Sequence, residues 1–283
     1  MNDQVEPIFK AIEFIEGHLH EDLTVAQIAD ATGYSLFHFM RKFNQMVHHT
    51  PYDYLMRRRL SEAARALVQT DLRIIDIACD YGFNDQETFS RVFRRMFQIT
   101  PSQCRKQNGI TSKCLMAAKT IEDLQFINGE HFHPPRMVDL QELVLVGLMT
   151  AVGENVQSTI EICERLVQDL RSAAGLKPNS DFYCMLLQVD AIKKAQYQFV
   201  GAQKADFDTL PPLLASGSLP SGRYLCMDVP ESELGRARGY VYSSWLPGAG
   251  LEEEDDRQIL RFTPDSDEAE RSFSIMIPIK RAA

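Results

Sequence analysis

The apolar residues of the first hundred positions follow a pattern that occurs twice. An Ile-Ala pair, a glycine four residues after the alanine, aromatic residues four apart and a Thr-Pro pair occur within residues 28–51 and again within residues 77–101. The second copy follows the first at an offset of 49 residues up to the glycine and 50 residues after it. Spacings of three and four residues place side chains on one face of an α-helix, so each copy predicts two short helices.

The sequence between the two helices of each copy predicts a tight turn. Gly33 and Gly82 follow the first helices and supply the left-handed backbone that ends them. Ser35 in the first copy and Asn84 or Asp85 in the second are suitable N-caps for the next helices. Two short helices joined in this way form a helix-turn-helix, whose second, recognition helix enters the major groove of DNA.

A longer helix is predicted between the copies, from residue 51 to residue 68. Its run of three arginines, residues 57–59, is expected to place at least one of them on a solvated face. A stiff rod of this kind would hold the two recognition helices about 34 Å apart, which is one turn of B-DNA. The inward positions of the rod are Tyr54, Leu55, Leu60, Ala63, Ala64 and Leu67.

After residue 137 the pattern changes to alternating strands and helices. Apolar runs, strict alternation and two amphipathic stretches give the order strand, helix, strand, strand twice in succession. Residues 108–136 are interpreted as a linker with room for a short helix or strand between residues 115 and 127. Strands are expected at residues 138–148, 182–189, 197–202, 223–229, 259–263 and 273–279, and helices at residues 160–175 and 231–243.

These patterns together predict a multidomain protein. An all-α tandem helix-turn-helix domain in residues 1–107 is followed, after the linker, by an α+β domain of two pseudo-symmetric β-α-β-β units in residues 137–283. A length of 283 residues allows two domains, because single cores usually span about 100–200 residues. The two β-α-β-β units share too little sequence to establish their relationship, but such a pair would enclose a groove between its halves.

The distribution of charge supports a nucleic-acid partner. The net charge of −9 would by itself oppose binding to the phosphate backbone. Residues 35–110, however, contain twelve Lys and Arg against seven acidic residues, whereas residues 1–34 contain one Lys and seven acids and residues 111–283 contain seventeen basic and twenty-five acidic residues. The positively charged segment therefore coincides with the predicted helix-turn-helix units, where a local basic patch favours DNA.

Several other classes of protein are disfavoured. The longest apolar run, residues 143–153, is too short to span a bilayer, and residues 1–8 lack the basic start of a secretory signal. The six cysteines lie far apart without a C-x-x-C pair, which argues against disulfides and zinc and favours reduced thiols in a cytoplasm. His131 and His133 have no third ligand nearby in the sequence, so loop positions are favoured over metal binding. No cofactor, metal or membrane is expected.

The second copy of the repeat contains Ile-Ala-x-x-x-Gly-Phe, then Phe-x-Arg-x-Phe and Thr-Pro. This signature resembles that of the AraC family of bacterial transcription regulators, and the resemblance covers residues 8–107. It implies a double helix-turn-helix domain that binds DNA. The family more often carries this domain at the C-terminus, so a sensor domain is expected to follow it here.

The resemblance also implies which side chains meet DNA. Outward residues of the two recognition helices contact base edges in this family, and their chemistry suits that role: Arg for guanine, Gln for adenine, Glu for cytosine, and Phe or Met for a thymine methyl group. Arg94 and Arg95 would also suit a solvated helix surface. The candidates for base contacts are Phe37, Met40, Arg41, Gln86, Glu87 and Arg91, and the candidates for phosphate contacts are Lys42, Arg57, Arg94 and Arg95.

A second marker lies near the C-terminus. Tyr-Val-Tyr-Ser-Ser-Trp-Leu-Pro-Gly-Ala-Gly at residues 240–250 is preceded by Leu-Pro-Ser-Gly-Arg-Tyr at residues 219–224 and followed by Met-Ile-Pro-Ile at residues 276–279. These motifs resemble the GyrI-like effector-binding domain over residues 137–281. The resemblance implies a groove for small, often cationic and aromatic molecules, held by cation–π and stacking contacts. Candidate wall residues, each of which could instead belong to the core, are Tyr183, Tyr224, Tyr240, Tyr242 and Trp245.

The chain departs from this second pattern at one position. Many proteins with the domain carry a glutamate, the counter-charge for a bound cation, just before an Arg-Phe or Arg-Tyr pair. The corresponding residue here is Leu260, before Arg261 and Phe262. The departure favours a neutral or less specifically cationic ligand, or a domain that has lost ligand binding.

The leading hypothesis is a ligand-responsive regulator that binds promoter DNA and a small-molecule effector, with RNA polymerase as a further candidate partner. Hydrolysis by the C-terminal domain is disfavoured, because the glutamate is replaced and no histidine follows His133. A protein-binding module is the alternative, and a groove filled with apolar side chains would favour it. The oligomeric state is left open, since one chain already supplies two helix-turn-helix units.

Overall fold

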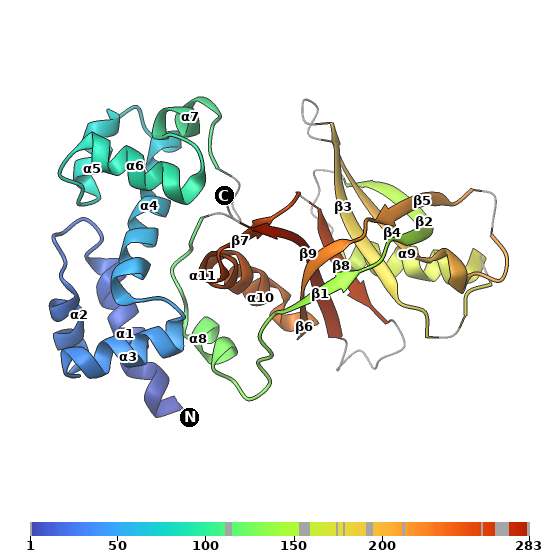
Figure 1. The fold of residues 1–283 in the computed structure, drawn as a ribbon, viewed down its shortest axis with the longest axis horizontal. Coiled ribbons are helices and arrows are strands. Elements are labelled where there is room, and N and C mark those ends of the chain that lie inside the picture. Colours follow the sequence, from blue (N-terminus) through green and yellow to red (C-terminus); the bar gives the residue numbers. More distant parts are fainter. Residues whose placement is uncertain are drawn as a thin grey trace. The chain divides into compact units, whose positions relative to one another are not determined.

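The computed structural model describes residues 2–110, 115–152, 159–173, 175–177, 179–190, 195–210, 213–255, 257–263 and 272–281. The chain forms two compact units, which Figure 1 draws as a group of helices and a sheet with its own helix. The first, called here the helical unit, comprises residues 1–132 and 239–249. The second, the sheet unit, comprises residues 133–238 and 250–283. A segment expected in the second domain therefore belongs to the helical unit.

The helical unit contains both predicted helix-turn-helix motifs. Helices α2 and α3 form the first motif, α5 and α6 form the second, and α4 lies between them in the chain, as the repeat predicts. The predicted cap Asp85 accepts a hydrogen bond from the Thr88 amide at 2.6 Å, whereas Ser35 makes no such bond to α3. The helices are α1 (Asn2–Gly17), α2 (Val25–Thr32), α3 (Leu36–Val47), α4 (Pro51–Gln69), α5 (Ile74–Asp80), α6 (Gln86–Phe97), α7 (Pro101–Lys106) and α8 (Ile121–Ile127).

The repeated Thr-Pro pairs mark where α4 and α7 begin. Thr50 and Thr100 accept hydrogen bonds from backbone amides of the first turn, at 3.1 and 3.2 Å. The prolines that follow occupy the first turn, where the missing amide hydrogen leaves no bond unmade. The pair therefore acts as a helix start signal in both copies.

Each motif packs an aromatic core against α4. In the first, the rings of Phe39 and Phe43 lie 5.4 Å apart, and Phe43 lies 5.8 Å from Tyr54 of α4. In the second, four phenylalanines form a chain with successive ring distances of 5.1, 5.4 and 4.7 Å. All six predicted inward positions of α4 are buried, so this helix is a wall of both cores. The four phenylalanines are Phe83, Phe89, Phe93 and Phe97.

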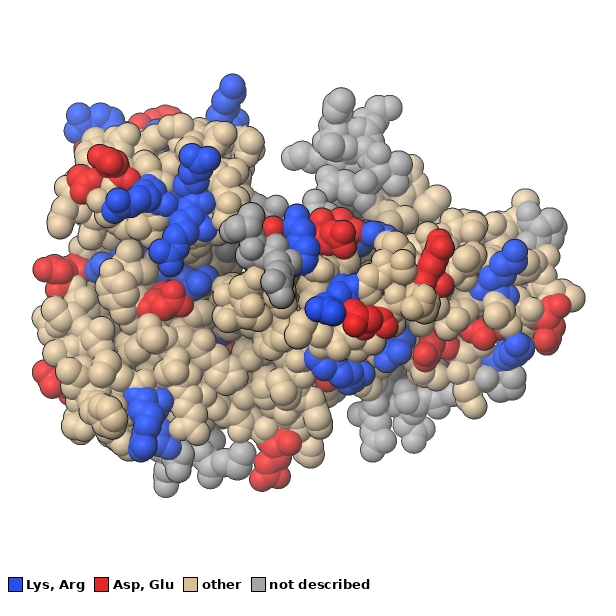
Figure 2. Space-filling view, viewed as in Figure 1, with Lys and Arg blue, Asp and Glu red and all other residues tan. Residues whose placement is uncertain are grey.

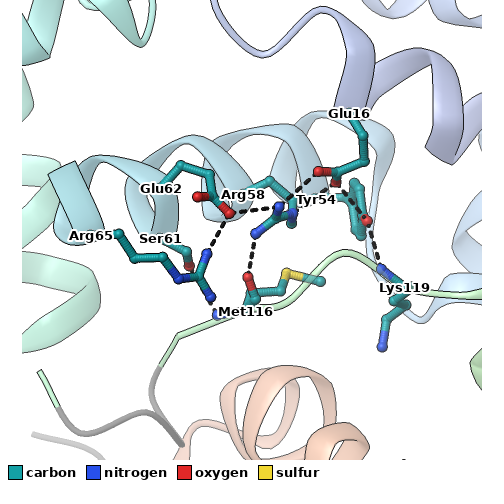
Figure 3. A network of polar contacts seen from close by, with 8 residues as sticks. All are labelled: Glu16, Tyr54, Arg58, Ser61, Glu62, Arg65, Met116 and Lys119. Atoms are coloured by element: carbon teal, nitrogen blue, oxygen red, sulfur yellow. Dashed lines mark hydrogen bonds and ion pairs between the residues drawn. The ribbon is translucent and has the colours of Figure 1, made fainter. Parts of the chain in front are cut away.

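Two of the three arginines in the run of α4 are buried, while Arg57 keeps 24% of its side chain exposed. The Arg58 side chain is 5% exposed and donates to both carboxylate oxygens of Glu16, each at 2.7 Å, and to the carbonyl oxygen of Met116 at 2.5 Å (Figure 3). Arg59 is also buried and donates to the carbonyl oxygens of Leu19 and Glu21. Both guanidinium groups therefore join α4 to the end of α1 and to the segments that follow α1 and α7.

Residues 115–132, which were expected to form part of a linker, pack on the helical unit. Met116, Leu124 and Ile127 are buried, and the stretch expected to form a helix or strand is the helix α8. The Met116 amide donates to Ser61 at 2.9 Å, and the Lys119 amide donates to the Tyr54 hydroxyl at 3.2 Å (Figure 3). The helical unit thus extends well beyond residue 107, because polar groups of α4 hold the next segment in place.

The sheet unit consists of a nine-stranded antiparallel sheet and helix α9 (Thr159–Ala173). The strand order is β1-β6-β9-β8-β3-β4-β2-β5, with β7 paired to β9 off this path. The predicted order strand, helix, strand, strand is present as β2-α9-β3-β4, whereas in the later part of the chain further helical turns and the short strand β7 stand between α10 (Leu234–Tyr240) and the strands β8 and β9. The strands are β1 (Arg136–Leu140), β2 (Leu143–Val152), β3 (Phe182–Asp190), β4 (Ala195–Gln203), β5 (Ala215–Leu219), β6 (Gly222–Pro230), β7 (Leu251–Glu253), β8 (Gln258–Phe262) and β9 (Ser272–Arg281).

The predicted second helix of this region continues further than expected. After a short 3₁₀ turn it runs through α10 (Leu234–Tyr240), a π-helical segment (Val241–Trp245) and α11 (Leu246–Ala249). Its last part is the segment that belongs to the helical unit. Among the residues that the structure describes, no helix is both long and apolar enough to cross a membrane.

Strand registers divide the sheet into two faces. Tyr183 lies opposite Arg261, and Met185 lies opposite Ile259 and Phe199, so these side chains share one face, called here the tyrosine face. A cluster of buried side chains occupies this face. The other face is covered over β4 and β2 by α9. The cluster consists of Leu145, Tyr183, Met185, Phe199, Leu219, Tyr224, Cys226, Ile259 and Met276.

Strands β5 and β7 were not predicted. β5 has the sequence Ala-Ser-Gly-Ser-Leu, without the β-branched and aromatic residues that favour strands. β7 has the sequence Leu-Glu-Glu, and Glu252 of this strand pairs with Lys280 of β9 at 3.6 Å. Both short strands form by pairing with a partner strand rather than by a local signal.

Candidate nucleic-acid interface

The turn of each motif depends on a glycine. Gly33 and Gly82 have φ angles of +73° and +77°, in the left-handed region predicted from the sequence. The Gly33 amide closes the end of α2 on the Asp30 carbonyl oxygen at 3.2 Å, and the Gly82 amide bonds to the Cys79 carbonyl oxygen at 3.0 Å. The two turns thus direct α3 and α6 away from the preceding helices in the same manner.

Helix α3 presents an exposed face with both apolar and basic side chains. Phe37 is 75% exposed and Met40 is 41% exposed, and Arg41 is exposed beside them. Phe39 and Phe43 on the opposite side are fully buried. Large apolar side chains that face solvent on a helix are typical of a binding surface. Leu36, which is also exposed at the start of α3, extends the same surface and was not among the sequence candidates.

Helix α6 presents the matching face of the second motif. Gln86, Glu87 and Arg91 are all exposed, while Phe89 and Phe93 are buried. Arg91 follows Arg41 by 50 residues, the offset of the repeat at this point. The predicted base-contacting positions therefore lie on exposed recognition helices, and their contacts with bases remain a prediction.

The four candidates for phosphate contacts differ in their surroundings. Arg94 and Arg95 are exposed in the last turn of α6, and Lys42 is half-buried. Arg57 is only 24% exposed and donates to Asp53 at 2.8 Å. Burial of Asp53 opposes its charge, but hydrogen bonds and charges of His49 and Arg57 lower the pKa of its carboxyl group to about 2. Arg57 is thus held by a permanently charged partner, which makes it the weakest candidate of the four.

Fewer basic side chains of residues 35–110 are available to DNA than their number in the sequence suggests. Arg58 and Arg59 are buried, and Arg105 donates to the carbonyl oxygens of Leu67 and Leu72 at 2.9 and 2.7 Å. Arg73 forms an ion pair with Asp76 at 2.7 Å. Figure 2 shows Lys and Arg side chains gathered over the part of the helical unit where Figure 1 draws α5, α6 and α7. The positive charge left for DNA is therefore concentrated near the second motif.

Comparison with known proteins agrees with this geometry. A model of the helix-turn-helix domain family matches residues 28–107. The regulatory protein SoxS of Escherichia coli K12 is 44% identical over 94 residues, which make up 33% of this chain and 88% of SoxS. The chain belongs to the AraC family of helix-turn-helix transcription regulators.

Other regulators are similar to part of the chain. The transcriptional regulator Rob of Salmonella typhimurium is 35% identical over 133 residues, which cover 45% of this chain and only 46% of Rob. A solved AraC-type transcriptional regulator from Chromobacterium violaceum is 31% identical and covers 36% of this chain and 92% of its own, with a TM-score of 0.36. The chain thus matches most of the length of SoxS but less than half of the length of Rob.

The predicted effector-site residues lie on elements of both units. Tyr183 and Tyr224 lie on the tyrosine face of the sheet unit, with Tyr224 donating to the Pro220 carbonyl oxygen at 2.9 Å. Leu260 lies on the opposite face, because it pairs with Cys184 and not with Tyr183. Tyr240, Tyr242 and Trp245 belong to the segment of the helical unit. Two of the five aromatic candidates thus belong to the sheet unit and three to the helical unit, and a shared role in binding an effector remains a prediction.

Within the helical unit, Tyr240 is a packing residue. It is 5% exposed, and its ring lies 5.2 Å from that of Phe132 and 5.4 Å from that of His48. Burial raises the pKa of its hydroxyl group to about 12. Sequence patterns gave no signal for this partnership, which joins residues far apart in the chain. The described residues contain no group of three His, Cys, Asp or Glu side chains arranged to hold a metal, and this includes His131 and His133.

Proposed function

We propose that the protein regulates transcription by placing α3 and α6 in successive major grooves of a promoter. The observation that carries this proposal is the pair of exposed faces at equivalent positions of the two motifs, with Arg41 and Arg91 fifty residues apart. A single chain then contacts two half-sites about one helical turn apart. Arginine at such positions can donate two hydrogen bonds to guanine, which gives sequence preference as well as affinity.

Replacement of Arg41 or Arg91 by alanine is the direct test. Each variant is expected to lose about 1–3 kcal/mol of binding free energy at a cognate site selected from random DNA, and to tolerate more bases at one position. The measurement is a fluorescence-anisotropy titration on cognate and random duplexes. Arg94→Ala is the matched control, because a lost phosphate contact weakens binding to both duplexes alike. Equal losses on both duplexes for Arg41→Ala and Arg91→Ala would contradict base contacts.

For the sheet unit we infer a small-molecule effector, as the resemblance to the GyrI-like domain implies. The order β2-α9-β3-β4, which β6-α10-β8-β9 matches when the short strand β7 and the helical turns before it are set aside, supports two related halves, as does the pairing of β3 with β8 at the centre of the strand order. The tyrosine face also carries a charged network: Arg261 donates to Ser274 at 3.1 Å, Ser274 bonds to Asp228, and Arg136 donates to Asp228 at 2.6 Å. The effector is then an aromatic molecule whose polar group binds this network.

Two probes of opposite charge test the effector proposal. Tetraphenylphosphonium and naphthalene-2-sulfonate are titrated into the full chain by calorimetry. Saturable binding of the cation that is lost in Asp228→Asn, or of the anion that is lost in Arg261→Met, is expected. Arg223→Ala is the control, since Arg223 forms an exposed ion pair with Asp139 away from this face. If neither probe binds, the effector proposal fails and the DNA-binding proposal stands.

The burial of both tyrosines on the tyrosine face favours an alternative function, the binding of a protein partner. Tyr183 is 3% exposed and Tyr224 is 1% exposed, and both pack among apolar side chains. A ligand would have to displace these side chains, whereas a protein partner would need only the outer surface of the sheet unit. RNA polymerase is one candidate for such a partner. Capture of the polymerase by the full chain without added ligand, together with failure of both probes, would favour this second function.

A further inference from the structure

The two helix-turn-helix motifs differ directly after their recognition helices. The first continues His48-His49-Thr50-Pro51, whereas the second continues Gln98-Ile99-Thr100-Pro101. The backbones are alike, since His48 and Gln98 cap their helices with φ angles of 61° and 60°. The second motif therefore shows that neither histidine is needed to form the corner between a recognition helix and the helix that follows.

Both histidines bond to the segment of residues 239–249. Nδ1 of His48 lies 2.7 Å from the hydroxyl oxygen of Tyr240, and Nε2 of His49 lies 3.0 Å from the hydroxyl oxygen of Ser244. The other ring nitrogen of His49 bonds to Asp53 at 2.6 Å, which fixes the orientation of the imidazole. His49, Tyr240 and Ser244 are each at most 5% exposed. Hydrogen bonds in such buried surroundings are costly to leave unmade.

Apolar contacts complete the attachment of the segment. Val241 and Leu246 are fully or nearly fully buried. Phe132 packs edge-on against Tyr240 and against Phe126 of α8, with ring distances of 5.2 and 5.6 Å. The π-helical turn of residues 241–245 follows Tyr240 directly and contains Ser244, and such turns are often found at functional sites. The attachment thus combines two oriented polar contacts with a small apolar core.

The end of α3 is held from a second side as well. The side-chain amide of Asn128 donates to the carbonyl oxygen of Met46 at 3.0 Å, in the last turn of the recognition helix. The chain enters the 239–249 segment from the sheet unit at residue 238 and returns to that unit at residue 250. Asn128 and the segment of residues 239–249, which are far apart in the sequence, therefore both contact the C-terminal end of α3. The segment is covalently continuous with the sheet unit at both of its ends.

We propose that residues 239–249 are a positioning element for the first recognition helix only. Tyr240 and Ser244 hold the corner between α3 and α4 through His48 and His49, so a change in the segment alters the contacts of α3 with DNA. The second motif, with Gln98 and Ile99 at the same places, is independent of the segment. The proposal rests on the function proposed above, because it assigns regulation to one of the two half-sites.

The test transfers the residues of the second motif to the first. The double variant His48→Gln, His49→Ile keeps a corner sequence that folds in the second motif of the same chain. In the full chain it is expected to increase amide hydrogen exchange in residues 239–249 by roughly tenfold or more, as expected when two hydrogen bonds are lost. Tyr240→Phe with Ser244→Ala should give the same result from the other side of the contact. Unchanged exchange in both double variants would overturn the attachment.

Footprinting on a duplex selected from random DNA separates the two half-sites. Protection of the half-site that loses sequence preference in Arg41→Ala should require about tenfold more protein in both double variants, while protection of the half-site assigned by Arg91→Ala is unchanged. Gln98→Ala is the matched control and should alter neither exchange nor protection of the first half-site. Equal loss at both half-sites would overturn the proposal. If no preferred duplex can be selected, the proposed function fails, and the exchange measurement still decides the attachment.

Discussion

Replacing Arg58 by alanine is expected to lower the free energy of unfolding of the helical unit by about 3–5 kcal/mol, because the change removes one partner from a buried ion pair. The side chain is 5% exposed, and its guanidinium group bonds to Glu16 of α1, to Glu62 of α4 and to the Met116 carbonyl oxygen. Although burial opposes the charge, hydrogen bonds and charges of Glu16 raise the pKa of Arg58 above its ordinary value. The variant would leave the Glu16 carboxylate without its main partner.

Urea unfolding followed by far-UV circular dichroism measures this loss, since helices dominate that signal. Arg65→Ala is the control on the same helix: Arg65 is 35% exposed and pairs with Glu62, so its loss should cost less than about 1 kcal/mol. A similar, small effect of both substitutions would show that the network in Figure 3 contributes little to stability. It would also mean that the hydrogen bond from Arg58 to Met116 does little to hold residues 115–119 on α4.

Replacing Gly82 by alanine is expected to destabilise the second motif by about 2–5 kcal/mol. A left-handed backbone costs an ordinary residue about 1–2 kcal/mol, and forcing an extra methyl group into a packed site adds about 1–3 kcal/mol. A Cβ atom at Gly82 would lie 2.8 Å from Nη1 of Arg59. That guanidinium group cannot move aside freely, because it bonds to the carbonyl oxygens of Leu19 and Glu21.

The first motif provides a matched control for this prediction. Gly33 has nearly the same φ angle, but a Cβ atom there would meet nothing within 4 Å. Gly33→Ala should therefore show the backbone cost alone, about 1–2 kcal/mol, in the same urea experiment. Equal effects of Gly33→Ala and Gly82→Ala would mean that Arg59 adapts and that its contacts are weaker than the geometry indicates.

Local sequence patterns were sufficient for the DNA-binding helices. The spacing of Phe39 and Phe43, repeated in Phe89 and Phe93, identifies the buried faces, and the exposed faces follow from helical geometry. The glycine of each turn was likewise predictable from its place after the first helix. Arg58 and Arg59 were not predictable, because their burial depends on partners in α1 and beyond residue 107 that no local pattern connects to α4.

For the candidate effector-site residues, prediction from sequence is limited by the alignment of single strand positions and by contacts between distant segments. Leu260 was aligned with a ligand-contacting position, but successive residues of a strand point to opposite faces, so a shift of one residue moves a side chain from one face to the other. Arg261, its neighbour, faces Tyr183 and carries part of the charged network. Continuity in sequence assigns the segment of residues 239–249 to the second domain, whereas its long-range contacts with His48, His49 and Phe132 place it in the first.

The assignment of residues 239–249 also bears on how such a protein can arise and be re-engineered. In this chain the path passes between the two units three times, after residues 132, 238 and 249. A gene fusion made at only one of these three crossings would separate the recognition helices from residues 239–249, which contact the end of α3. It would also join them to a foreign domain that has no sequence to replace this segment. The helical unit and the sheet unit are therefore expected to be inherited together.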